Sequence, residues 1–134
     1  MPILSYTSDL LPKVISGEKF HTIRFGSRIW KVGDQAIHAS GIRAPDYREH
    51  RRDLVTRVDS ITIRILKPLG KTHDSNIFID DEILAAAAVC RLARNDGFLG
   101  SAAFFQYFRK SLKPGIHTGQ LIQWKDKPVD YLNL

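Results

Sequence analysis

The sequence predicts a mixed α+β domain whose short strands form a small mixed or antiparallel β-barrel flanked by short helices. The clearest strand is residues 58–67, in which isoleucines alternate with polar side chains. The clearest helix is residues 101–112, where three phenylalanines recur at spacings that meet on one face. Strands and helices follow one another without a regular βαβ rhythm, which favours α+β over α/β. Several short twisted strands of this kind can close into a barrel.

The first third of the chain predicts one helix and two strands. A helix is expected over residues 9–16, capped by Ser8 or Asp9, because Pro12 suits its first turn and Gly17 suits its C-terminal end. A strand is expected at 20–24. After the turn signal Gly33-Asp34, a further strand is expected at 35–39.

The second half predicts two helices and one closing strand. Residues 77–79 favour a short strand, after which Asp80 or Asp81 is expected to cap a helix that runs through the alanine-rich segment to about Arg94. The helix at 101–112 follows. Residues 119–124 are expected to form the last strand of the sheet.

Composition indicates one ordinary globular domain over residues 1–134. Apolar residues make up 43% and charged residues 25% of the chain, values typical of soluble proteins. No apolar run approaches the roughly 20 residues that a membrane span needs, so we expect a cytoplasmic protein that does not contact a membrane. The single cysteine, Cys90, lies in an alanine-rich segment and is expected to be buried and inert. The composition leaves the oligomeric state open.

The five histidines are scattered, so we expect no metal site. The glycines near residue 97 lack the lysine and hydroxyl residue of a nucleotide-binding loop, and we expect no cofactor.

The net charge of +6 favours a partner that carries phosphate groups, such as RNA. The basic residues are densest in segment 41–57, which we expect to be a polar loop inserted in the domain. Arginine side chains suit phosphate, and the candidates for nucleic-acid contact are Arg43, Arg48, Arg51, Arg52 and Arg57. Acidic residues interrupt the segment, so a solvated loop with local ion pairs is the alternative.

The residues after Gly17 have the side chains best suited to catalysis or ligand binding. Lys19 stands at the start of the expected strand, and Thr22 and Arg24 share one of its faces. A lysine beside a threonine hydroxyl can act as base and nucleophile; the alternative is a surface lysine next to a strand threonine. His21 points to the opposite face. It is included with Gly17, Arg24 and Trp30 among the candidates for ligand contact.

Several short motifs, in this order, resemble the ASCH superfamily, whose members have a barrel similar to the PUA domain of RNA-modifying proteins. The motifs are ISGEK (15–19) running into TIR (22–24), WKVGD (30–34), DGF (96–98) ahead of FF (104–105), and GQLIQW (119–124). They cover most of the chain. Segment 41–57 is then the insertion in one barrel loop.

The resemblance implies a function in RNA or nucleoside chemistry. One branch of the superfamily deacetylates N4-acetylcytidine with a lysine base, a threonine nucleophile and a glutamate acid. By motif, the first two roles fall on Lys19 and Thr22, and the third falls on Asp96, which is shorter than glutamate by one methylene. As general acid Asp96 would need a raised pKa. Arg24 or a backbone N–H near Gly17 would bind the oxyanion.

Other functions remain open from the sequence. Another ASCH protein is reported to act as a ribonuclease, so cleavage of RNA with a histidine as acid or base is an alternative. A further alternative is a module that binds RNA without catalysis, and a third is a protein-interaction domain that uses the basic segment.

Overall fold

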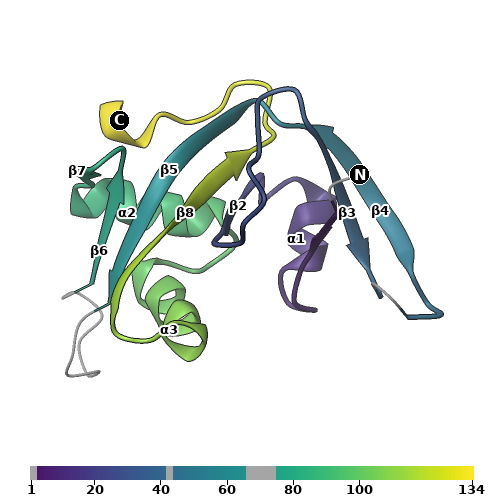
Figure 1. Cartoon of the computed structure of the whole chain (residues 1–134), viewed down its shortest axis with the longest axis horizontal. Coiled ribbons are helices and arrows are strands. Elements are labelled where there is room, and N and C mark those ends of the chain that lie inside the picture. The colour runs from purple at the N-terminus through teal and green to yellow at the C-terminus, as the bar shows by residue number, and fades with distance from the viewer. Residues whose placement is uncertain (1–2, 42–43, 66–74) are drawn as a thin grey trace.

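The computed structural model describes residues 3–41, 44–65 and 75–134, and it has mixed α+β architecture. Within these residues, eight strands form two sheets (Figure 1). In chain order the elements are β1 (Ile3–Ser5), α1 (Leu11–Ser16), β2 (His21–Arg24), β3 (Gln35–Ser40), β4 (Arg48–Leu54), β5 (Arg57–Ile65), β6 (Asn76–Ile79), β7 (Glu82–Ile83), α2 (Ala86–Asn95), α3 (Ser101–Ser111), β8 (Gly115–Gln123) and the 3-10 helix η2 (Tyr131–Asn133).

The larger sheet has the order β2-β8-β5-β6-β7, and all its pairs are antiparallel. In the smaller sheet, β3 pairs with β1 in parallel and with β4 in antiparallel orientation. The expected α+β class is therefore confirmed. The described strands do not close into one barrel, because each sheet keeps two unpaired edges. Between β1 and β2 the link is a side-chain contact instead, from Arg24 to the carbonyl of Ser5.

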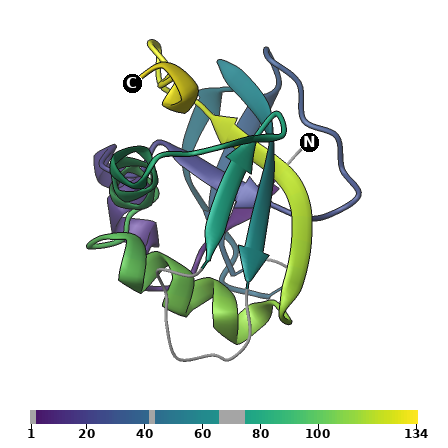
Figure 2. The same cartoon turned by 90° about the vertical axis from the view of Figure 1, so that its left-hand side faces the viewer.

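Two apolar clusters hold the elements together. The larger lies between the five-stranded sheet and helices α2 and α3, which Figure 2 shows covering one side of that sheet. The alternating isoleucines of β5 face this cluster, as predicted, together with Phe104 of α3. The smaller cluster joins α1, β3 and β8, and it includes Val14 and Trp30. The start of β2 therefore lies between two packed layers, which fixes the residues around Lys19.

The structure differs from the expected elements in several places. Helix α1 begins at Leu11 with Leu10 as its N-cap, not Ser8 or Asp9. Asp80 and Asp81 have φ angles of 49° and 66° and form the turn between β6 and β7, since aspartate tolerates the left-handed conformation. They do not cap α2, whose N-cap is Ala85. The last strand begins at Gly115, earlier than residue 119. The short strand β1 was not expected.

The segment 41–57, which was expected to be a loop, contains a strand. Residues 48–54 form β4 at the edge of the smaller sheet, where it pairs with β3. Its side chains are polar on both faces, so no apolar alternation marks it in the sequence, and charged residues are common on edge strands. Arg43 lies outside the described residues. No helix in the described ranges is long and apolar enough to cross a membrane.

Candidate functional site

A pocket of about 530 Å³ opens where β2 begins, α2 ends and α3 passes. This volume is in the range of sites that bind small molecules. Its polar lining includes four residues that the sequence singled out, and aromatic residues form part of its wall. The four polar residues are Lys19, Thr22, Arg24 and Asp96, and the aromatic residues are Tyr6, Phe25, Phe98, Tyr107 and Phe108.

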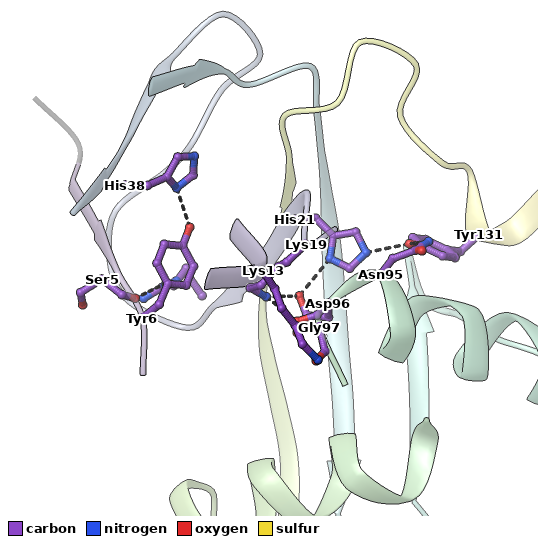
Figure 3. Close-up of polar contacts among 11 residues, drawn as sticks. Ser5, Tyr6, Lys13, Lys19, His21, His38, Asn95, Asp96, Gly97 and Tyr131 are labelled. Carbon is purple, nitrogen blue, oxygen red and sulfur yellow. Dashed lines mark hydrogen bonds and ion pairs between the residues drawn. The ribbon is translucent and has the colours of Figure 1, made fainter. Parts of the chain in front are cut away.

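Lys19 is buried in this pocket, with only 1% of its surface exposed. Its Nζ lies 2.7 Å from Oδ1 of Asp96 and 2.8 Å from the carbonyl oxygen of the same residue (Figure 3). The interpretation of Lys19 as a surface lysine is therefore wrong. A neutral lysine amine has two N–H groups and one lone pair. With both N–H groups donated to Asp96, the lone pair is left to accept a proton.

The end of α2 brings Asp96 to Lys19. Asp96 is the C-cap of α2, and Gly97 follows with a φ angle of 100° that side-chain-bearing residues rarely adopt. The last carbonyl groups of a helix lack partners within it and attract cations. Lys19 binds the carbonyl of Asp96, and Lys13 of α1 binds that of Gly97 at 2.6 Å. Two lysines thus hold the end of α2 against the α1–β2 segment.

His21 supports Asp96 from the side away from the pocket. Its Nδ1 is 2.9 Å from Asp96 Oδ1, and its Nε2 is 2.7 Å from the hydroxyl of Tyr131. Because the carboxylate can only accept, Nδ1–H donates to Asp96 and Nε2 accepts from Tyr131. The Tyr131 oxygen in turn accepts from Asn95 Nδ2 at 2.8 Å. Every member of this buried chain has a partner, so Asp96 is held in one orientation.

Burial governs the ionisation of these groups. It lowers the pKa of Lys19 below its ordinary value, and the charge of Arg24 adds to the effect while Asp96 opposes it. Burial also lowers the pKa of His21, which stays neutral, as its hydrogen bonds require. For Asp96, burial opposes ionisation, but Lys19 and His21 outweigh it, and the pKa of Asp96 lies below its ordinary value. The general-acid role would need the opposite shift.

Thr22 and Arg24 complete the polar side of the pocket. Thr22 is 5% exposed, and within the described ranges its hydroxyl forms no hydrogen bond. Arg24 donates from Nη2 to the carbonyl of Ser5 at 2.8 Å, which orients the guanidinium. Its Nε is buried and finds no acceptor among the described residues. Both residues line the pocket, so a ligand carbonyl bound there can accept a hydrogen bond from the guanidinium group or from the Thr22 hydroxyl.

Three of the candidates for ligand contact lie elsewhere. Gly17 caps α1 with a φ angle of 89°, and its N–H donates to Val14, so it is not available to an oxyanion. Trp30 packs in the smaller apolar cluster and does not line the pocket. His21 does not line it either, because it is fully buried behind Asp96. These residues shape or support the site, and none of them contacts its interior.

The basic residues of β4 and β5 form local ion pairs, as the alternative interpretation holds. Arg51 donates two hydrogen bonds to Asp53, at 2.7 and 3.0 Å, and Arg52 donates two to Glu49, at 2.8 and 2.9 Å. Arg57 lies 2.8 Å from a carboxylate oxygen of Asp59. Arg48 is exposed at the start of β4. None of these arginines lines the pocket around Lys19.

Within the described ranges, no group of three or more His, Cys, Asp or Glu side chains is placed to hold a metal ion.

Sequence reasoning missed one residue of the pocket lining, Tyr6, and four residues that support the site from behind it, namely His38, Asp53, Asn95 and Tyr131. They come from β3, β4, the end of α2, η2 and the residue after β1. Each is an isolated polar or aromatic residue with no local motif, so only the fold brings them together.

The chain was compared with protein-family models, with curated proteins and with solved structures, and none of the three comparisons finds a match.

Proposed function

We propose that the protein binds RNA or a modified nucleobase in the pocket around Lys19, and that it hydrolyses the amide of an acylated nucleobase such as N4-acetylcytidine. The observation that carries the proposal is the buried Lys19–Asp96 pair in the same pocket as the hydroxyl of Thr22. The ASCH resemblance motivates the choice of substrate, and we propose a PUA-like relationship for the fold on the same ground.

Lys19 is suited to the role of general base. An amine accepts a proton only when it is neutral, and burial lowers the pKa of Lys19 toward that state. Asp96 holds both N–H groups of the amine and so turns the lone pair away from itself. Asp96 is then a positioning residue. Its lowered pKa keeps it ionised, so we do not retain it as the proton donor.

In the first half of the reaction, the oxygen of Thr22 attacks the acyl carbon while its proton moves to Lys19 Nζ. The electron pair of the carbonyl double bond moves to the carbonyl oxygen, which the guanidinium group of Arg24 in the same pocket can bind. The carbon–nitrogen bond then breaks, and the departing base nitrogen takes the proton from the Lys19 ammonium. The acyl group remains on Thr22 as an ester.

In the second half, water attacks the ester carbon and gives a proton to Lys19. The oxygen of Thr22 leaves and recovers that proton, and the carboxylic acid is released. In each half of the reaction, Lys19 first accepts a proton and then donates it. No carboxyl group is therefore needed as a general acid.

The aromatic wall supports a planar substrate. Phe25, Phe98 and Tyr107 line the pocket beside its polar side, and aromatic rings bind nucleobases by stacking. The net charge of +6 favours a nucleic acid or nucleotide. The single cysteine suits a reducing compartment, so we propose that the protein acts in the cytoplasm.

RNA cleavage is supported less well. It needs a histidine that can exchange protons with the substrate, but both ring nitrogens of His21 are bonded to buried partners. The paired arginines of β4 also offer little free charge to a phosphate backbone. Binding of RNA without catalysis would need the pocket but not the hydroxyl of Thr22.

The test is release of acetate and cytidine from N4-acetylcytidine by the purified protein. Thr22→Ala and Lys19→Ala should each lower kcat by about 100-fold or more, since nucleophile and base are lost. Thr22→Ser should keep part of the activity. Lys31→Ala and Thr118→Ala, on exposed residues outside the pocket, are matched controls that should retain full activity. If the unmodified protein releases no acetate, the hydrolase proposal fails.

A further inference from the structure

A second chain of hydrogen bonds reaches the pocket from the three-stranded sheet. The hydroxyl of Tyr6 lies 2.8 Å from Nδ1 of His38, and Nε2 of His38 lies 3.1 Å from Oδ2 of Asp53 (Figure 3 shows the first contact). Arg51 adds two hydrogen bonds to the carboxylate of Asp53. His38 is fully buried, and its ring centre lies 4.5 Å from that of Trp124, the residue that follows β8. Contacts from Tyr6, Asp53 and Trp124 therefore hold this imidazole in place.

The direction of each hydrogen bond in the chain follows from Asp53. Its carboxylate, paired with Arg51, can only accept, so Nε2–H of His38 donates to it. Burial lowers the pKa of His38 to about 4, and the ring is therefore neutral near pH 7. Nδ1 must then accept, and the hydroxyl of Tyr6 donates. The proton of Tyr6 is committed to His38, and the phenol does not supply it to the pocket.

The ring of Tyr6 faces the two basic side chains of the pocket. The guanidinium carbon of Arg24 lies 5.3 Å from the ring centre, and Nζ of Lys19 lies 5.9 Å from it. Both distances are within the range in which the ring face attracts a cation. Tyr6 also lines the pocket, so the ring stands between the small sheet and the site.

We propose that Tyr6 is a positioning residue whose ring, held by His38 and Asp53, sets the place of Lys19 and Arg24 in the pocket. Its importance for catalysis rests on the proposed function, but its effect on Lys19 does not. The small sheet then contributes to the site without supplying a group that reacts. Neither the nucleic-acid contacts expected of segment 41–57 nor the ASCH resemblance gives Tyr6, His38 or Asp53 a role.

The expected effect is on the protonation of Lys19. The groups that face its amine are Asp96, Arg24, Tyr6 and, through Asp96, His21, while the nearby Lys13 binds Gly97. Of these, Asp96 and the ring of Tyr6 favour the charged form. Tyr6→Leu removes one of the two, so the pKa of Lys19 should fall by about half a unit, a threefold change in proton affinity.

The experiment is an NMR titration of the Lys19 side chain in the unmodified protein and in Tyr6→Leu. The matched control is Tyr107→Leu. Tyr107 lines the same pocket, but its ring contacts Phe98 and Phe108. The control should leave the pKa of Lys19 unchanged. If Tyr6→Leu leaves it unchanged too, the proposal is overturned.

Tyr6→Phe provides a second test that does not depend on the fold tolerating leucine. It keeps the ring and removes the donor to His38, so the Nδ1 resonance of His38 should move while the imidazole stays neutral. A neutral His38 that carries its proton on Nδ1 in the unmodified protein would contradict the chain of donors.

The two proposals fail in different ways. If amide hydrolysis occurs, the acidic limb of its pH profile should move to lower pH in Tyr6→Leu by the same half unit, which a purely structural role of Tyr6 would not produce. If no acetate is released but the pKa of Lys19 moves as expected, the positioning role stands and the proposed function fails. If acetate is released but the pKa of Lys19 does not change, the proposed function stands and the positioning role of Tyr6 fails.

Discussion

Lys19 and Asp96 are 77 positions apart in the chain, yet the Nζ of the lysine lies 2.7 Å from a carboxylate oxygen of the aspartate. Both side chains are almost entirely buried. A buried ion pair contributes little when it is complete, but loss of one partner leaves an uncompensated charge. The pair therefore matters both for the stability of the protein and for the proposed chemistry.

Replacing Asp96 by asparagine should destabilise the protein. Asp96→Asn leaves Lys19 without its counter-charge, and the loss of one partner of a buried pair costs about 3 kcal/mol. Urea denaturation at pH 7 measures the change in the free energy of unfolding. The control is Glu49→Gln, which breaks the exposed pair with Arg52 and should have little measurable effect. Equal stability of the two variants would contradict the importance assigned to burial.

Stability should decrease as the pH falls below neutrality. The pKa of His38 is 6.5 in the unfolded chain and about 4 in the folded protein. Between these values the unfolded chain binds more protons, so folding weakens as the pH falls from about 6.5 to about 4. At about 1.4 kcal/mol per unit, the loss from His38 is at most about 3 kcal/mol. His21, whose pKa burial also lowers, acts in the same direction.

Urea denaturation at several pH values measures this dependence. His38→Asn should flatten the decrease, because asparagine does not titrate. His50→Asn is the matched control, since His50 is only half-buried in β4, and this variant should keep the slope of the unmodified protein. A slope that survives the loss of His38 would assign the titration to other groups.

Removing the hydroxyl of Tyr131 should disturb the site from behind. Tyr131→Phe leaves Nε2 of His21 without its donor and Asn95 without its acceptor, and a buried group without a partner costs about 1–3 kcal/mol. The Nε2 resonance of His21 in the NMR spectrum should shift, while the hydrogen bond to Asp96 keeps the proton on Nδ1. Tyr107→Phe, which changes a more exposed tyrosine, should alter neither quantity.

Adding a methyl group at Gly97 should push on Lys19. Gly97 has a φ angle of 100°, and a Cβ there would lie 3.0 Å from Leu10 Cδ2 and 3.4 Å from Lys19 Cδ. Gly33 has a similar φ angle of 94° but open space around it. Gly33→Ala therefore measures the backbone cost, about 1–2 kcal/mol. Gly97→Ala should cost more in urea denaturation and should shift the NMR signals of Lys19. Equal losses of stability in the two variants would mean that the end of α2 moves to accommodate the methyl group without a further cost.

The sequence predicts the elements that carry a repeating pattern. The isoleucines of β5 and the phenylalanines of α3 face the core because alternation and helical spacing reflect burial directly. Gly17 was also predicted correctly as the cap of α1. The strand β4 was not predicted, because none of its residues is fully buried and an edge strand of this kind needs no apolar residues.

The candidate site was predicted in part for a similar reason. Lys19, Thr22 and Arg24 are close in sequence, so their spacing alone predicts that they lie near one another. All three line one pocket. The depth at which Lys19 is buried depends on the end of α2 and on the aromatic wall, which no local pattern encodes. His21 was expected beside a ligand, but the fold places Asp96 and Tyr131 on either side of it.

The pairing of β2 with β8 has a consequence for how the pocket comes into being. His21 pairs with Gln123 and Arg24 with Gln120, so β2 finds its only ladder partner in the described sheet nearly a whole chain later. Contacts between segments so distant in sequence form slowly, since a long loop must close first. Lys19 and Thr22 precede β8 in the chain, so we expect β2 to take its place in the sheet only after β8 has been synthesised. We therefore expect the pocket to be completed late in folding.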